Sequence, residues 1–413
     1  MLQKAIALLL FITSLLLLNA AKATDLGLPE DFDRDPNIMS PKEFWGFDVG
    51  AYHPRHDQIN AYFQYLAENS ERVSLEISGF SHDRRPIILA VFASPERDIA
   101  EIKNTRRAAS RSGQGPVIAW MGYSVHGNEA SAASAAVQTA YYLAASRDSE
   151  VQSWLDEMVV VMEPVLNPDG LDRFAHWVNM HRGQHPSSDP NDREHNEIWP
   201  NGRTNYYWFD LNRDWMPQVH PESRARMAQY YAWQPHLVTD FHEMGRNSTY
   251  FFQPGIPNRN NPLTPSEVFE ITANIATHHA KAMDQASESY YTKESFDDYY
   301  VGKGSTYPDI TGGVGILFEQ GSSRGHVQDT DFGQRTFADA IANQVITSLS
   351  SLRGAAANAE ALKAYQKGFF ETAREIARDD RDAGWVIGDG GDLARAGILI
   401  DRLLQHQIEI YPT

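Results

Sequence analysis

The chain has 413 residues, a formal net charge of −18 and no cysteine. The acidic balance argues against nucleic acid and anionic lipid as partners. The absence of cysteine excludes disulfides, thiol nucleophiles and thiolate metal ligands. The length suffices for one large domain with a smaller addition.

Residues 1–23 have the pattern of a secretory signal peptide. Lys4 precedes an apolar run over residues 5–18, and Ala21 and Ala23 frame a small-residue cleavage site. A membrane anchor is the weaker interpretation, because the run is shorter than the roughly 20 residues that span a bilayer. We therefore expect a secreted or periplasmic protein without a membrane span after removal of this segment.

Apolar runs of strand length alternate with helical patterns along the rest of the chain. We expect strands over residues 73–77, 86–91, 116–122, 158–162, 237–241 and 315–318, and helices over residues 130–145, 221–233, 265–290 and 336–352. This alternation indicates an α/β fold with a mixed, mostly parallel sheet sandwiched between helices. The polar stretch 176–204 is longer than an ordinary loop and predicts an ordered active-site rim.

Polar motifs follow the ends of the expected strands. In chain order they are His126-Gly127-Asn128-Glu129, Asn167-Pro168-Asp169-Gly170, Asp210-Leu211-Asn212-Arg213, Asp240-Phe241-His242 and Leu317-Phe318-Glu319. Open α/β sheets bind ligands at the carboxyl ends of their strands, so these motifs are placed to form one site. The nitrogen and oxygen donors of His126 and Glu129 suit zinc, but two ligands do not complete a zinc site.

Each motif also has an ordinary structural interpretation. A His–Glu pair at a helix start is by itself more often a cap or a surface feature than a ligand set. Glu319 could be a buried carboxylate in a salt bridge, and Asn212 with Arg213 could be a plain turn. Asn167-Pro168-Asp169-Gly170 is best interpreted as a structural turn. His242 does not begin a His-Glu-x-x-His zinc helix, because position 246 is arginine.

The ordered set of motifs resembles the zinc metallocarboxypeptidases of the carboxypeptidase A/B superfamily, in particular exported bacterial members, over about residues 29–352. The resemblance implies an eight-stranded mixed sheet and one zinc ion per chain. It implies His126, Glu129 and His242 as the zinc ligands, with the fourth position left for water. It also implies that Asp210 accepts the second N–H of the first zinc histidine.

The catalytic and substrate-binding roles likewise follow from the resemblance. Glu319 matches the general base, which activates a zinc-bound water and passes the proton to the leaving amine. Asn212 and Arg213 match the residues that hold the terminal carboxylate of the substrate, and a guanidinium suits a carboxylate because it binds in two places. Tyr299 and Tyr300 are both candidates for the mobile tyrosine that covers the substrate.

Three arginines are candidates for the residue that polarises the scissile carbonyl. Arg203 lies seven residues before Asp210 and resembles the Arg-x-Asn segment of compact bacterial members, while Arg182 and Arg193 are the alternatives.

We therefore expect an exported zinc metallocarboxypeptidase that hydrolyses the C-terminal amide bond of peptides with a free terminal carboxylate. The first alternative is an amidase or deacylase on the same fold, acting on cell-wall peptides or acyl-amino acids. The second is a non-catalytic module that binds peptide tails.

Three segments follow from these expectations. Residues 1–23 are the signal peptide, residues 24–355 the carboxypeptidase-like catalytic domain, and residues 366–413 a C-terminal appendage. The appendage is predicted as β-α-β, with strands over residues 385–387 and 408–411 around a helix over residues 393–406. It is either a small complete unit or the start of a truncated second domain.

Overall fold

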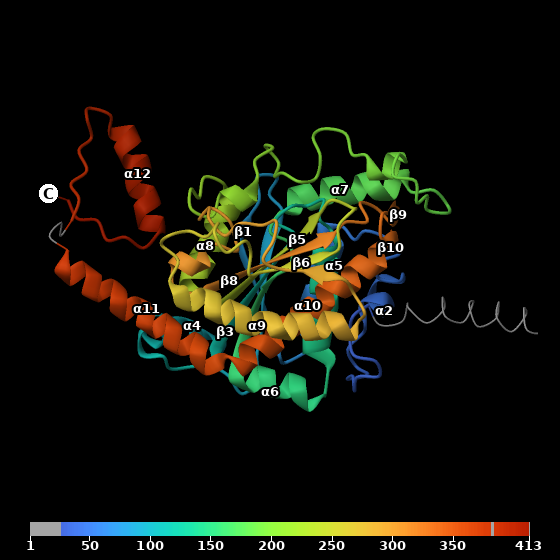
Figure 1. Cartoon of the computed structure of the whole chain (residues 1–413), viewed down its shortest axis with the longest axis horizontal. Helices are drawn as coiled ribbons and strands as arrows, with labels where there is room; N and C mark the ends of the chain where they lie inside the picture. Colours follow the sequence, from blue (N-terminus) through green and yellow to red (C-terminus); the bar gives the residue numbers. More distant parts are fainter. Residues whose placement is uncertain (1–25, 381–383, 413) are drawn as a thin grey trace, which may run out of the picture.

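The computed structural model describes residues 26–380 and 384–412, so the expected signal peptide lies outside the described residues (Figure 1). Its centre is an eight-stranded sheet in the order β1-β2-β4-β3-β5-β8-β6-β7. Three of the strand pairings are antiparallel, and four are parallel, namely β3 with β4, β3 with β5, β5 with β8 and β6 with β7. The mixed α/β sandwich expected from the sequence is confirmed.

Six strands of the sheet lie where apolar runs predicted them, whereas its two short strands and the two strands of a separate hairpin were missed. The strands are β1 (Val73–Phe80), β2 (Pro86–Phe92), β3 (Val117–Tyr123), β4 (Met158–Glu163), β5 (Leu237–Met244), β6 (Tyr250–Phe252), β7 (Tyr290–Tyr291) and β8 (Val314–Gly321). A separate hairpin is formed by β9 (Val327–Thr330) and β10 (Gly333–Thr336).

Helices cover both faces of the sheet (Figure 1). The helices of the described residues are α2 (Pro41–Trp45), α3 (His56–Asn69), α4 (Ile99–Ser112), α5 (Ser131–Ala145), α6 (Ser149–Glu157), α7 (Pro168–His181), α8 (Pro221–Trp233), α9 (Ser266–Gln285), α10 (Phe337–Ala357), α11 (Ala359–Asp379) and α12 (Leu393–Gln405), of which α12 stands apart from the sheet.

Alternate residues of β3 pack against the helices on opposite faces of the sheet. Ala119 and Met121 belong to the core that contains residues of α5, α9 and α10, whereas Ile118 and Trp120 belong to the core with residues of α8. A strand buried on both faces has apolar residues at every position, which explains the unbroken apolar run. The sheet is thereby held rigidly, and its strand ends can position polar side chains.

The motif at residues 167–170 begins helix α7 instead of closing a loop. The Asn167 side chain accepts a hydrogen bond from Gly170 N at 2.9 Å and caps the helix, and Pro168 occupies its first turn. The motif therefore has a structural role, and the long polar rim starts only after His181.

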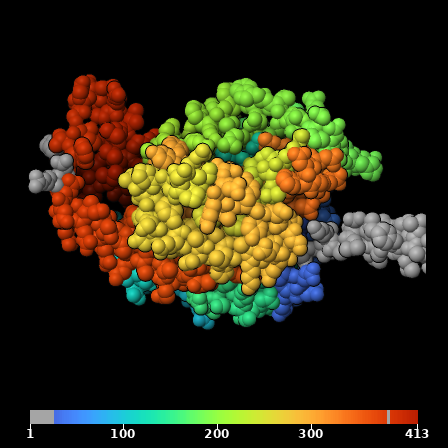
Figure 2. Space-filling view, viewed as in Figure 1, coloured from blue at the N-terminus to red at the C-terminus, as the bar shows by residue number. Residues whose placement is uncertain are grey.

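The C-terminal appendage is not β-α-β. Residues 384–391 and 406–412 contain no strand, and Trp385 is 91 % exposed. These segments stand away from the sheet, so their backbones have no neighbouring strand to bond with (Figures 1 and 2). The prediction of strands over residues 385–387 and 408–411 was wrong. The first half of α11, by contrast, packs on the main core through Leu362 and Tyr365.

In the described part of the chain, no helix combines the length and apolar character needed to cross a membrane.

Candidate metal centre and active site

Three buried side chains converge where β3 and β5 end. His126 follows β3, Glu129 precedes α5, and His242 lies near the end of β5. The two histidine Nδ1 atoms are 3.1 Å apart, and each lies 2.9 Å from a Glu129 oxygen, His126 from Oε1 and His242 from Oε2. The three predicted ligands are thus brought to one point, with all their donor atoms within 4.8 Å of one another.

The outward ring nitrogens of both histidines are held by carboxylates. His126 Nε2 lies 2.8 Å from Asp210 Oδ1, and His242 Nε2 lies 3.0 Å from Asp240 Oδ2. Such partners fix the tautomer and leave the other nitrogen to bind a metal. Burial alone would raise the pKa of Asp210, but the His126 hydrogen bond and nearby Arg203 and Arg213 lower it below its usual range.

The donor set fits zinc. Two imidazole nitrogens and one carboxylate are the ligands of a catalytic zinc site with an open fourth position. Both nitrogens face inward because their opposite nitrogens are bonded to carboxylates, so the geometry favours the metal-binding tautomer of each ring.

Glu319 lies beside this centre on β8. It is the direct register partner of His242 on the adjacent parallel strand, which places both side chains on the same face of the sheet. Burial raises the pKa of Glu319 to about 8, against the opposing effect of His242. Among the residues that the structure describes, none donates a hydrogen bond to its carboxylate. Glu319 is therefore a carboxyl group free to exchange a proton.

Of the three candidate arginines, only Arg203 touches the centre. Its guanidinium bridges Glu129 Oε1 at 3.2 Å and Asp210 Oδ2 at 2.9 Å, and the side chain is 40 % exposed. Arg182 instead stacks over the Tyr52 ring at 4.7 Å, and Arg193 stacks over the Trp177 ring at 5.4 Å.

Asn212 and Arg213 face different surroundings, although both lie in the short 3₁₀ helix η2 (Leu211–Arg213). The buried Asn212 amide donates to Asp240 Oδ2 at 3.2 Å and lies 2.9 Å from His242 Nε2, while its oxygen accepts from Gly304 N at 2.9 Å. Arg213 is exposed, and one of its nitrogens donates to the backbone oxygen of Asn212 at 2.8 Å. The structure thus places Asn212 behind His242 and leaves Arg213 open to solvent.

The two candidate tyrosines are also distinguished by their contacts. The Tyr300 hydroxyl donates to the backbone oxygen of Arg213 at 3.2 Å. The backbone oxygen of Tyr299 accepts from the Asn261 amide at 2.6 Å, and its ring is exposed. The Tyr300 side chain therefore lies against the Arg213 loop.

Asp240 and Glu243 support the centre, and the sequence analysis gave neither a role at the metal. Asp240 lies two residues before His242 on one strand, so both side chains point to the same face, and this period of two was the available signal. Glu243 directly follows His242 on β5. It accepts from Ser131 N at 2.8 Å, while its own N–H donates to Glu129 Oε2 at 2.9 Å. It therefore ties the start of α5 to a ligand.

A cavity of about 350 Å³ opens beside Glu129 and is lined by Arg203, Arg246 and Arg324. Arg246 and Arg324 come from loops after β5 and β8, which meet only in the folded chain. In the described part of the chain, neither has an ion-pair partner. No local sequence signal pointed to them.

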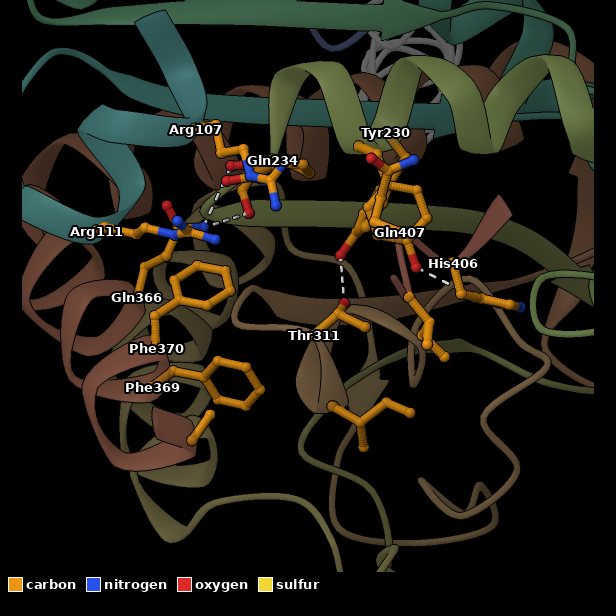
Figure 3. Close-up of a pocket in the computed structure, with 15 residues that line it drawn as sticks. Arg107, Arg111, Tyr230, Gln234, Thr311, Gln366, Phe369, Phe370, His406 and Gln407 are labelled. Atoms are coloured by element: carbon orange, nitrogen blue, oxygen red, sulfur yellow. Dashed lines mark hydrogen bonds between the residues drawn. The ribbon is translucent and has the colours of Figure 1, made fainter. Parts of the chain in front are cut away.

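A larger cavity of about 520 Å³ lies away from the centre (Figure 3). Arg107 and Arg111 of α4 line one side, Phe369 and Phe370 of α11 another, and His406 closes it after α12. It contains none of the residues predicted for the metal centre.

Three solved structures with a similar fold are described as carboxypeptidases. A metallo-carboxypeptidase from Burkholderia cenocepacia aligns with a TM-score of 0.52 and 16 % identity over 73 % of this chain and 70 % of that one. Carboxypeptidase A from Helicoverpa armigera aligns with a TM-score of 0.51 and 18 % identity over 80 % and 77 %. A metallo-carboxypeptidase from Pseudomonas aeruginosa aligns with a TM-score of 0.51 and 15 % identity over 75 % and 71 %.

At these identities the likeness is one of fold. No curated protein sequence matches the chain significantly. A sequence profile described as zinc carboxypeptidase matches residues 59–313, which is more than half of the chain. The chain therefore belongs to the zinc carboxypeptidase family and is a zinc-dependent metallocarboxypeptidase, as its ordered motifs predicted.

Proposed function

We propose that this protein is exported and removes the C-terminal residue from peptides that carry a free carboxylate. The observation that carries the proposal is the position of Glu319 beside the centre formed by His126, Glu129 and His242, where its carboxyl group accepts no hydrogen bond from any described residue. Export is supported by the signal-peptide pattern of residues 1–23.

In this proposal His126, Glu129 and His242 hold the zinc ion. When bound, zinc supplies a Lewis acid that polarises a carbonyl group and acidifies water. Glu319 takes a proton from the attacking water, whose oxygen bonds to the carbonyl carbon. It then gives that proton to the leaving nitrogen as the C–N bond breaks. Burial raises the pKa of Glu319, and the positive charge of a bound zinc ion would lower it again, so the carboxylate form can accept the proton near neutral pH.

Arg213 is proposed to hold the terminal carboxylate of the substrate. Its guanidinium is exposed and keeps N–H groups free for a two-point contact with a carboxylate. Asn212 is better suited to a positioning role, because its amide already contacts Asp240, His242 and Gly304 N. Tyr300, whose hydroxyl reaches the Arg213 backbone, is the better placed of the two tyrosines to cover the bound residue.

Arg203 is proposed to polarise the scissile carbonyl. Its contacts with Glu129 and Asp210 hold its guanidinium at the centre, while 40 % of the side chain remains accessible to a substrate oxygen.

The arginine-lined cavity supports a preference for acidic substrates. Arg246 and Arg324 present two positive charges without carboxylate partners in the described residues. A carboxylate about 4 Å from one of them would gain roughly 4 kcal/mol of Coulomb energy at an effective dielectric constant of 20, before desolvation. The same cavity favours the second candidate function, an amidase that trims acidic cell-wall peptides.

The test is mass spectrometry of a diverse peptide mixture incubated with the zinc-loaded chain starting at Thr24. Each peptide is supplied with a free and with an amidated C-terminus, and Glu319→Gln is the matched control. Stepwise loss of C-terminal residues from the free acids only, absent with Glu319→Gln, is the expected result. No cleavage of either set by a chain with zinc at its centre would overturn the proposal and favour the amidase.

A further inference from the structure

A second group of metal-binding side chains lies outside the catalytic centre. His82 lies in the turn between β1 and β2, while His220 and Glu222 lie at the start of α8. The three donor atoms are within 4.8 Å of one another. The group therefore joins two elements that are about 140 residues apart in sequence.

The nitrogen atoms of this group already face each other. His82 Nε2 lies 3.1 Å from His220 Nδ1 and 4.0 Å from Glu222 Oε2. The ligand atoms of a tetrahedral zinc ion with bonds of about 2.0–2.2 Å are roughly 3.3 Å apart. All three ligand atoms lie within 4.8 Å of one another, close to that spacing.

Glu222 supplies the independent observation that points to a ligand. The residue is only 2 % exposed, and its Oε2 atom has no hydrogen-bond partner among the residues that the structure describes. The other oxygen, Oε1, accepts from the backbone N–H of His82 at 3.2 Å, and Oε2 lies 4.0 Å from His82 Nε2. Leaving a buried carboxylate oxygen without a partner costs free energy, and an ion is one of the partners that satisfy such groups in native proteins.

We propose that His82, His220 and Glu222 form a second site for a divalent transition metal such as zinc. Two imidazole nitrogens and one carboxylate oxygen are the donor types that zinc prefers, and a fourth position is left for water. The His82 side chain is 25 % exposed, which gives the ion a route from solvent.

A metal at this site would fasten the β1–β2 turn to the loop that carries Arg213. The Asp214 carboxylate accepts from the N–H groups of Val219 and His220, each at 2.9 Å. The backbone of His220 is thereby bonded to the residue next to Arg213. The second metal is thus a structural clamp, and its effect on substrate binding rests on the role proposed for Arg213.

The test is the number of zinc ions per chain, measured by mass spectrometry of the metal content after equilibrium dialysis against buffered zinc. The full mature chain is expected to bind two. His82→Ala and Glu222→Gln are each expected to bind one, as is His126→Ala, which damages only the catalytic centre. His185→Ala, an exposed histidine in the polar rim, is the matched control and is expected to bind two.

A thermal melt in the His126→Ala background separates the second site from the first. Zinc is expected to raise Tm saturably in this variant, and adding His82→Ala is expected to abolish the rise. One zinc ion per wild-type chain, with no zinc-dependent Tm shift in His126→Ala, would overturn the proposal. Neither measurement uses a peptide substrate, so an absence of carboxypeptidase activity would leave both results interpretable.

Discussion

The Asp210 carboxylate accepts hydrogen bonds from two charged or metal-binding groups, His126 Nε2 at 2.8 Å and Arg203 Nη2 at 2.9 Å. Asp210→Asn keeps the size of the side chain but replaces one accepting oxygen by an NH₂ group. Because both neighbours are donors, that NH₂ group must face one of them. In either orientation the variant loses the negative charge behind His126, and in one of them it also loses the hydrogen bond that fixes the His126 tautomer.

Loss of such a partner behind a metal ligand typically weakens metal binding by 10- to 100-fold, which is about 1.4–2.7 kcal/mol. We expect this loss in the dissociation constant for zinc, measured by competition with a chromophoric chelator at pH 7.5. Asp156→Asn, an exposed position on α6, is the control and is expected to change nothing. An unchanged zinc affinity in Asp210→Asn would refute the argument that this carboxylate prepares His126 for the metal.

Three further predictions concern other parts of the molecule. Arg213→Met should lower kcat/KM for free-acid peptides by about 10- to 150-fold, since a hydrogen bond to a charged group contributes about 1.5–3 kcal/mol, and steady-state kinetics would show no such loss if Arg213 did not bind the carboxylate. Arg324→Gln should reduce the preference for Glu-containing over matched Gln-containing peptides, measured as the ratio of their kcat/KM values. An unaltered ratio would show that the cavity does not recognise acidic substrates. Burial raises the pKa of Glu163 from 4.5 to about 7, so the folded state holds this proton more tightly and stability falls as pH rises from about 4.5 to about 7. The free energy of unfolding of Glu163→Gln should therefore exceed that of the wild type by about 3 kcal/mol at pH 8 and by almost nothing at pH 4.5. Urea denaturation at both pH values tests this, and midpoints with the same pH dependence in the two proteins would contradict it.

The buried strands could be predicted because their signal is local. β3 is apolar at every position since it contacts a helical layer on each face, and that run is visible without the fold. β6 and β7, with three and two residues, are too short to show a period. The segments at 385–387 and 408–411 have strand composition but no neighbouring strand, so local composition alone misled the prediction.

The candidate site was predictable as a set of positions and less so as a set of roles. Strand ends place His126, Glu129 and His242 together because parallel strands share one edge, and the motifs mark those ends. The direction of a side chain could not be predicted in this way. Asn212 faces the rear of His242 and not the substrate because of its contacts with Gly304 and Asp240, which are distant in sequence. The sequence likewise did not show that Arg203, and not Arg182, contacts Glu129 and Asp210. Nor did it show that Arg246 and Arg324 line one cavity.

The most direct test of the catalytic centre is a crystal structure of the zinc-loaded, active chain with anomalous diffraction recorded on both sides of the zinc absorption edge. We predict an anomalous peak about 2.0–2.2 Å from His126 Nδ1, His242 Nδ1 and a Glu129 oxygen, on the side of His242 that faces Glu319. A zinc peak elsewhere in the molecule, with this position empty in crystals that still cleave peptides, would contradict the assignment of the centre.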